Sequence, residues 1–177
     1  MCTQGVILCQ IVFHKGKYEP KKWQIRMEVG NVYIGMTNHS IDSKGRIVLP
    51  AKFREELGDT FYILRCHNVP GIQVLSVDAY KSINEQISAL PLRMAQILQY
   101  TYAATASEVS PNAQGRIAIP QKLREYAGIE DEAIVIGMYD HIEIWNEEKY
   151  NSYVAENSAD ATDALEAFDK ISLKGGI

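Results

Sequence analysis

Gly45-Arg46-Ile47-Val48-Leu49-Pro50-Ala51-Lys52-Phe53-Arg54-Glu55 is the stretch that decides the fold, because the chain repeats it as Gly115-Arg116-Ile117-Ala118-Ile119-Pro120-Gln121-Lys122-Leu123-Arg124-Glu125. The two copies are 115 − 45 = 70 residues apart, and that offset gives 11 identical residues among the 41 from 40 to 80. Unrelated segments would share about 6% of their positions from residue usage alone. We therefore expect two structurally similar units, matched without a gap at this offset.

Each unit is predicted to contain the same elements in the same order: a β-prone run, a polar turn, a brief strand, a short helix and two further strands. The ranges are 32–37, 42–45, 46–49, 50–58, 60–65 and 72–77 in the first unit, and 101–109, 111–115, 116–119, 120–128, 133–138 and 142–145 in the second. Pro50 and Pro120 suit the first turn of a helix, and Gly58 and Gly128 suit the left-handed residue that ends one.

The segments outside the two units are predicted to be helical. Apolar residues recur at three- and four-residue steps from Asp78 to about Ala104, which indicates two helices separated at Pro91. A short helix is expected at 147–154, an acidic amphipathic helix at 159–173 and disorder from Gly175 onward. The domains are therefore taken as 1–31, an N-terminal extension of doubtful authenticity; 32–80, the first repeat; 81–104, a helical connector; 105–150, the second repeat; and 151–177, an acidic C-terminal helix or tail.

The net charge of −4 hides a strong segregation of charge along the chain. From Glu125 to the C-terminus there are 13 acidic and 3 basic residues, a balance of −10, which leaves 15 basic and 9 acidic residues, or +6, before it. Residues 42–54 and 112–124 each carry a formal +3. Attraction of phosphate depends on the local field, so an acidic chain can still bind DNA.

Several function classes find no support in the sequence. No apolar run approaches the roughly 18 residues that span a bilayer, and the three cysteines have neither metal-site spacing nor the pattern of a disulfide framework. There is no glycine-rich phosphate loop, and no nucleophile, base and acid recur together. We expect a cytoplasmic protein that is not an enzyme, with no cofactor, no metal, no membrane partner and no small-molecule substrate.

The polar turns are the candidate DNA-binding elements, because a loop that enters a groove needs a tight turn with cations at its tip. Arg46 and Arg116 offer a planar fork for guanine, Gln114 can bind an adenine edge, and Lys44 offers a point charge for phosphate. The full set of candidates is Asp42, Ser43, Lys44, Gly45, Arg46, Asn112, Gln114, Gly115 and Arg116. The alternative for Asp42 and Arg46 is an ion pair that only holds the loop.

Four further cations follow the turns on the predicted short helices. These possible phosphate contacts are Lys52, Arg54, Lys122 and Arg124. A solvated helix face, or pairing with neighbouring glutamates, explains them equally well.

Residues 39–55, with the second copy at 115–120, closely resemble the MraZ family of bacterial regulators, and the resemblance covers about 32–173. It implies an α+β fold in which two tandem AbrB-like swapped-hairpin half-domains form one β-rich domain with helical inserts, and it implies assembly into a closed ring. The family's pattern is Asp, three residues, Arg. It is intact from Asp42 to Arg46, but Asn112 departs from it in the second unit, where the amide can accept a hydrogen bond but cannot form a charged pair. The resemblance therefore leaves the second loop with a less certain DNA role.

The resemblance also implies a function and a starting point for the chain. The function is a sequence-specific transcriptional regulator, expected to repress its own operon for division and cell-wall synthesis at the nucleoid, with double-stranded DNA carrying promoter repeats and further copies of itself as partners. The alternative is an antitoxin-type DNA-binding protein whose acidic tail binds a partner, although such antitoxins carry one repeat. Family members begin shortly before residue 32, so Met27 is the expected start, and a genuine N-terminal extension is the alternative.

Overall fold

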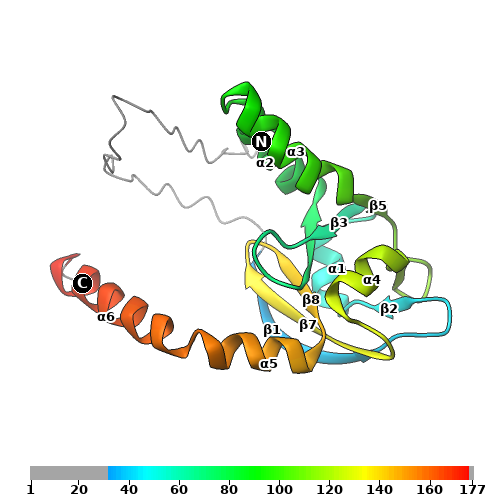
Figure 1. Cartoon of the computed structure of the whole chain (residues 1–177). Coiled ribbons are helices and arrows are strands. Elements are labelled where there is room, and N and C mark those ends of the chain that lie inside the picture. Colours follow the sequence, from blue (N-terminus) through cyan, green and yellow to red (C-terminus); the bar gives the residue numbers. More distant parts are fainter. Residues whose placement is uncertain (1–31, 176–177) are drawn as a thin grey trace, which may run out of the picture.

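Figure 1 shows the computed structural model, a mixed α+β fold described for residues 32–175. The strands are β1 (Tyr33–Ser40), β2 (Arg46–Val48), β3 (Phe61–Arg65), β4 (Ile72–Ser76), β5 (Ser107–Val109), β6 (Arg116–Ala118), β7 (Glu132–Tyr139) and β8 (Ile142–Trp145). The helices are α1 (Ala51–Leu57), α2 (Val77–Ser88), α3 (Leu92–Thr101), α4 (Gln121–Ala127), α5 (Glu147–Glu156) and α6 (Ser158–Gly175), with a 3-10 turn η1 (Ala103–Thr105). The predicted extension 1–31, with the expected start at Met27, lies outside the described residues.

The two repeats are interleaved rather than placed side by side. Six strands form one antiparallel sheet in the order β1-β7-β8-β4-β3-β5, and β2 pairs with β6 in a second, two-stranded sheet. Four of these pairings join the repeats, because β1 pairs with β7, β5 with β3, β4 with β8 and β2 with β6. Both sheets therefore contain strands from both repeats.

The offset between the repeats changes inside the sheet, so the prediction of a gap-free match is wrong there. Val74 pairs with Ile63, and its equivalent Ile144 pairs with Val135. Val74 and Ile144 are 144 − 74 = 70 residues apart, whereas their partners Ile63 and Val135 are 135 − 63 = 72 residues apart. The second repeat has two more residues before β7 and closes β7 to β8 through a tighter turn, in which Tyr139 takes a positive φ of 72°.

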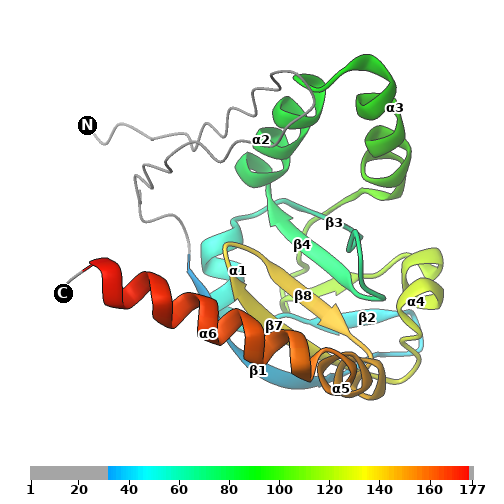
Figure 2. The same ribbon diagram turned by 60° about the vertical axis from the view of Figure 1, so that its left-hand side comes forward.

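Alternation along the strands sends side chains to two separate clusters. Ile144 belongs to the main core, whereas its neighbour Trp145 belongs to a smaller cluster on the other face of the sheet. The main core also takes Phe53 from α1 and Leu123 from α4. Figure 2 shows α5 beyond the end of β8, and the Tyr150 ring of this helix contacts Trp145 edge-on. Burial of apolar surface stabilises both the main core and the smaller cluster around Trp145.

The predicted helices are confirmed between the repeats, but one predicted strand is largely wrong. α2 and α3 are separated at Pro91 as expected, and Ser76 caps α2 by accepting a hydrogen bond from Ala79 N. The strand expected at 101–109 is confined to β5, because α3 reaches Thr101 and η1 follows it. The Thr105 hydroxyl donates to the Thr101 carbonyl at 2.9 Å and satisfies an acceptor at the helix end.

The two glycines that end α1 and α4 differ. Gly128 is left-handed helical, with φ 68° and ψ 32°, as predicted. Gly58 has a positive φ of 84° but an extended ψ of −168°, so its predicted left-handed conformation is wrong. The connection from α1 to β3 lacks the two extra residues that the second repeat has before β7. The backbone at Gly58 is therefore already extended toward β3. α6 runs to Gly175, and the last two residues lie outside the described residues.

A polar network lies beside the Trp145 cluster and is centred on Glu143. The carboxylate of Glu143 accepts hydrogen bonds from the Trp145 indole N–H at 2.8 Å and from the Cys66 thiol at 3.5 Å. The His141 ring lies between this carboxylate, 3.2 Å from Nε2, and that of Asp140, 2.7 Å from Nδ1. Burial lowers the pKa of His141, but the hydrogen bonds that its ring donates to the two carboxylates outweigh this effect and raise the pKa to about 9.

We expect protonated His141 to stabilise the fold. Because its pKa rises from 6.5 to about 9, this stabilisation is complete below pH 6.5 and is lost as the pH rises through 9. Urea titrations should show the free energy of unfolding fall by about 1–3 kcal/mol between pH 6.5 and 9.5. His141→Gln should remove this dependence, and an unchanged profile in the variant would contradict the role of the network.

Candidate nucleic-acid interface

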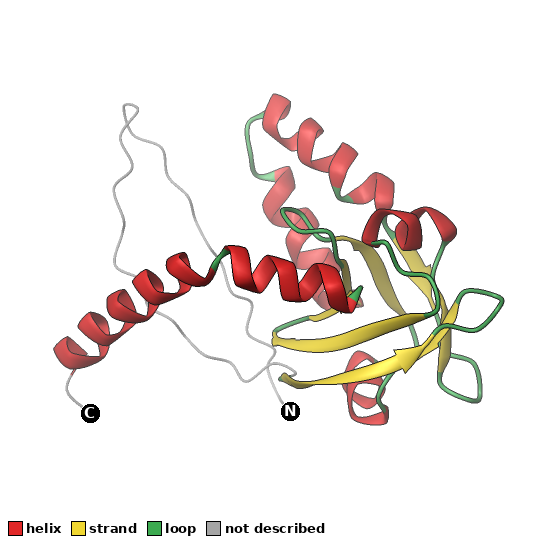
Figure 3. Cartoon of the chain, turned by 60° about the horizontal axis from the view of Figure 1, so that its bottom comes forward, coloured by secondary structure: helices red, strands yellow, loops and turns green. Residues whose placement is uncertain are grey.

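Two loops leave the same end of the molecule, and they hold the candidates predicted from the sequence. Loop one (residues 41–45) joins β1 to β2, and loop two (residues 110–115) joins β5 to β6. Figure 3 shows them side by side at the edge opposite α6. The pairing of β2 with β6 fixes their spacing, because Gly45 O accepts from Ile119 N at 2.9 Å and Gly115 O accepts from Leu49 N at 3.3 Å.

The side-chain oxygen of the first turn residue shapes both loops in the same way. Asp42 Oδ1 accepts hydrogen bonds from the backbone N–H groups of Lys44 and Arg46 at 2.9 and 3.0 Å. In loop two, Asn112 Oδ1 accepts from the N–H groups two and four residues later, at 3.0 and 2.9 Å. The backbone bond from the glycine N–H to the carbonyl of residue 42 or 112 is 2.8 Å in each loop. The departure at Asn112 therefore leaves the turn unchanged.

The arginines differ between the loops. Arg46 Nε donates a hydrogen bond to Asp42 Oδ2 at 2.8 Å, and Arg46 Nη2 lies 2.8 Å from the same oxygen, which is the ion pair considered as an alternative from the sequence. Arg116 Nη1 lies 4.0 Å from the same Oδ2. The hydrogen bond from the Arg46 side chain is the main reason that the pKa of Asp42 is lowered to about 2. One carboxylate thus stands between two guanidinium groups.

The remaining candidates fall into an exposed set and a partly buried set. The side chains of Ser43, Lys44, Gln114, Lys52 and Lys122 are exposed. Arg54 and Arg124 are partly buried, and their Nε atoms donate to the Leu49 and Ile119 carbonyls at 3.1 and 3.3 Å.

Arg54 and Arg124 also brace the loop of the opposite repeat. A Cβ added to Gly45 would lie 2.7 Å from Arg124 Nε, and one added to Gly115 would lie 2.6 Å from Arg54 Cζ. Both glycines have a left-handed φ, 71° and 73°. Each glycine therefore meets two requirements at once, a backbone conformation and room for a guanidinium group. The sequence does not reveal the packing of each arginine against the opposite loop. The repeat shows that Arg54 and Arg124 are equivalent but not which loop each one contacts.

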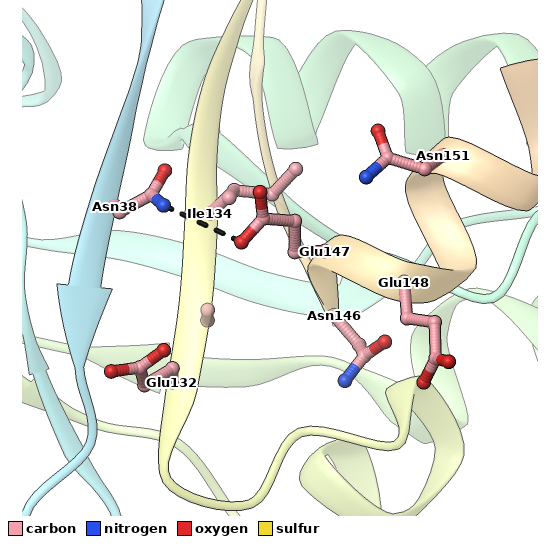
Figure 4. Close-up of a pocket in the computed structure, with 8 residues that line it drawn as sticks. Asn38, Glu132, Ile134, Asn146, Glu147, Glu148 and Asn151 are labelled. Atoms are coloured by element: carbon pink, nitrogen blue, oxygen red, sulfur yellow. Dashed lines mark hydrogen bonds between the residues drawn. The ribbon is translucent and has the colours of Figure 1, made fainter.

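Carboxylates line the hollows outside the loops. A hollow of about 560 Å³ beside loop one includes Glu125, Glu130 and Asp131 among its lining residues. A second, of about 380 Å³, lies between β1, β7 and the start of α5 (Figure 4). There Asn38 Nδ2 donates to Glu147 Oε2 at 3.4 Å. The carboxylates make both hollows unfavourable for an anionic partner.

The described residues offer neither a metal site nor a membrane-spanning helix. Within residues 32–175, no group of three or more His, Cys, Asp or Glu side chains is placed to hold a metal ion. Among the helices described here, none is long and apolar enough to cross a membrane.

Gly45→Ala is expected to destabilise the protein by about 1–3 kcal/mol, because it adds backbone strain and a contact with Arg124. Gly58→Ala measures backbone strain alone, since nothing lies within 4 Å of an added Cβ, and its extended ψ of −168° makes that strain larger than at Gly45. Arg124→Ala combined with Gly45→Ala should remove the steric part and leave about 1 kcal/mol of strain. Urea unfolding of the variants measures this, and strictly additive losses would rule out the contact.

Comparisons with known proteins agree with the repeat. A family model described as "MraZ protein, putative antitoxin-like" matches residues 32–96 and 102–170. A protein from Caldanaerobacter subterraneus subsp. tengcongensis is 37% identical over 146 residues, which are 79% of this chain and 99% of that protein. One from Clostridium acetobutylicum is 38% identical over 145 residues, 80% of this chain and 100% of that protein. Both relatives are named Transcriptional regulator MraZ. The chain belongs to the MraZ family.

Proposed function

We propose that the chain is a sequence-specific DNA-binding regulator of transcription and that loops one and two contact the DNA. The observation that carries this proposal is the meeting of Arg46 and Arg116, one from each repeat, at the end of the molecule where both loops project. The names of the relatives support it. Arginine is the side chain best suited to a bidentate contact with guanine, and a loop with few bulky groups can enter a groove.

The candidates divide into groups that select bases and groups that hold phosphate. Arg46, Arg116 and Gln114 present forked or amide groups suited to base edges. Lys44, Lys52 and Lys122 are exposed and suit phosphate. Arg54 and Arg124 use Nε for a backbone carbonyl, so their Nη groups are proposed for phosphate. Ser43, Gly45 and Gly115 keep the loop tips small, and Asp42 and Asn112 hold the turns.

The proposed architecture is a pair of AbrB-like swapped-hairpin half-domains within one chain. The pairing of strands between the repeats supports it, because each of the four cross-repeat pairings resembles an exchange between two halves. In this proposal the half-domains are 32–80 and 105–150, joined by the helical connector 81–104 and followed by the acidic tail 151–177.

We also propose that copies of the chain assemble into a ring. Soluble monomers rarely expose large apolar patches, yet the side chains of Leu92 and Tyr100 on α3 are 76% and 79% exposed, and those of Leu165 and Phe168 on α6 are 65% and 63% exposed. The two helices lie on separate parts of the molecule (Figure 2). Two different patches favour a head-to-tail contact, and such contacts form a closed ring when the rotation between neighbours closes on itself.

In this proposal the ring represses the operon for division and cell-wall synthesis that encodes it, by occupying repeated short sites near the promoter. Such a regulator acts in the cytoplasm at the nucleoid. Each subunit contributes only two small cationic loops, so a single copy binds weakly. Several loops on one ring make the later contacts intramolecular and raise the overall affinity.

An antitoxin-type protein is the second candidate function. The description of the family as antitoxin-like favours it, and so do the exposed apolar side chains of the acidic helix α6. A partner would then bind α6 while the loops bind DNA. Two repeats in one chain argue against it, because antitoxins of this type carry one.

DNA affinity should depend on the number of sites. The protein's mass in solution is measured first, and gel shifts then use DNA from upstream of its own gene, followed by probes with one, two and three copies of the mapped repeat. We expect an oligomer whose affinity rises steeply with copy number and falls steeply with salt. A monomer that binds one copy as tightly as three would exclude this mechanism.

A further inference from the structure

We propose that Arg116, rather than Arg46, is the principal side chain by which this chain selects its DNA, and that Asn112 is the residue that determines this. The inference rests on the proposed function, because it assigns different roles to the two loops of that site. It reverses the expectation that the change from Asp to Asn weakens the second loop.

The two turns differ in one side-chain atom, which is Oδ2 in Asp42 and the amide nitrogen in Asn112. Oδ1 of Asp42 and of Asn112 accepts the same two backbone hydrogen bonds, so both turns are held equally well. Oδ2 of Asp42 then binds Arg46 at 2.8 Å. Asn112 has an amide nitrogen in place of that oxygen, and an amide N–H cannot accept a hydrogen bond from a guanidinium group.

Arg116 is consequently the less neutralised of the two arginines. The carboxylate recorded beside it belongs to the other repeat and is 4.0 Å away, at the outer limit of an ion pair. Its side chain is 41% exposed, compared with 31% for Arg46. Arg116 can therefore turn to a base or phosphate without first breaking a short charged hydrogen bond.

Loop one has a more negative surrounding. Asp42 stays ionised at any pH at which DNA remains a duplex, and Arg46 must give up part of this pair to bind DNA. The hollow beside loop one adds Glu125, Glu130 and Asp131. The exposed Lys44 supplies the free positive charge of this loop. Loop one is thus left with Lys44 as its contact with phosphate, whereas loop two can select bases through Arg116 and Gln114.

The test restores the missing carboxylate with Asn112→Asp, which keeps the Oδ1 acceptor of the turn. Fluorescence anisotropy measures the affinity for a duplex from upstream of the gene and for an unrelated duplex of equal length, over a range of salt. We expect Arg116→Ala to weaken specific binding roughly 5- to 150-fold, and Arg46→Ala to weaken it less. Asn112→Asp should weaken it about tenfold and lower the salt slope by about one.

The combined variants separate an effect through Arg116 from a general effect of charge. Asn112→Asp should add little to Arg116→Ala, because the new carboxylate acts through that arginine. Asp42→Asn is the matched control, and it should strengthen binding or leave it equal while Asn112→Asp weakens it. Thermal unfolding and mass in solution establish that each variant folds and assembles.

Two results would overturn the inference: an unchanged affinity for Asn112→Asp, or a larger loss for Arg46→Ala than for Arg116→Ala. The second would mean that Asp42 orients Arg46 for DNA instead of holding it back. If Asn112→Asp does not fold, the ranking of the two alanine variants decides the question. A wild-type chain with no preference for the upstream duplex would overturn the proposed function itself, and the inference with it.

Discussion

The pairing of β2 with β6 is the constraint on which the rest of the structure depends. It contains three residue pairs and is centred on Ile47 and Ile117, which face each other and are completely buried. Because this ladder joins the repeats, the two loops that precede its strands lie at a fixed distance. It also brings Arg54 and Arg124 against the loop of the opposite repeat. A hairpin closed within one repeat would give neither result, so the core and the site are produced by the same exchange of strands.

The repeated motif made much of this predictable. Its turns, short strands and short helices follow from residue types at fixed offsets, and the separation of α2 from α3 follows from Pro91. The pairing partners could not be predicted, because a repeat shows that Ile47 and Ile117 are equivalent without showing that they are neighbours. The strand expected from 101 failed for a different reason. Its threonines are β-prone, but their hydroxyls satisfy helical carbonyls at the end of α3.

Differences between the repeats carry as much information as their similarity. Two extra residues before β7 place Glu130 and Asp131 beside loop one, and Asn112 removes a carboxylate from loop two. The segregation of charge seen in the sequence also acquires a spatial meaning, since the acidic helix α6 extends away from the side of the molecule where the loops lie (Figure 3). The negative charge of α6 is thereby kept away from the loops proposed for DNA, although Glu130 and Asp131 stay beside loop one, and a chain with a net charge of −4 can still attract a polyanion locally.

The central claim is that the two loops act on DNA as one unit, held together by the β2–β6 ladder. Hydrogen–deuterium exchange of the full chain, with and without the duplex from upstream of its gene, tests it most directly. The account predicts slower exchange on DNA binding in peptides that cover 42–46 and in those that cover 112–116, with the same dependence on DNA concentration. Protection of one loop alone, or protection confined to α5 and α6, would contradict it.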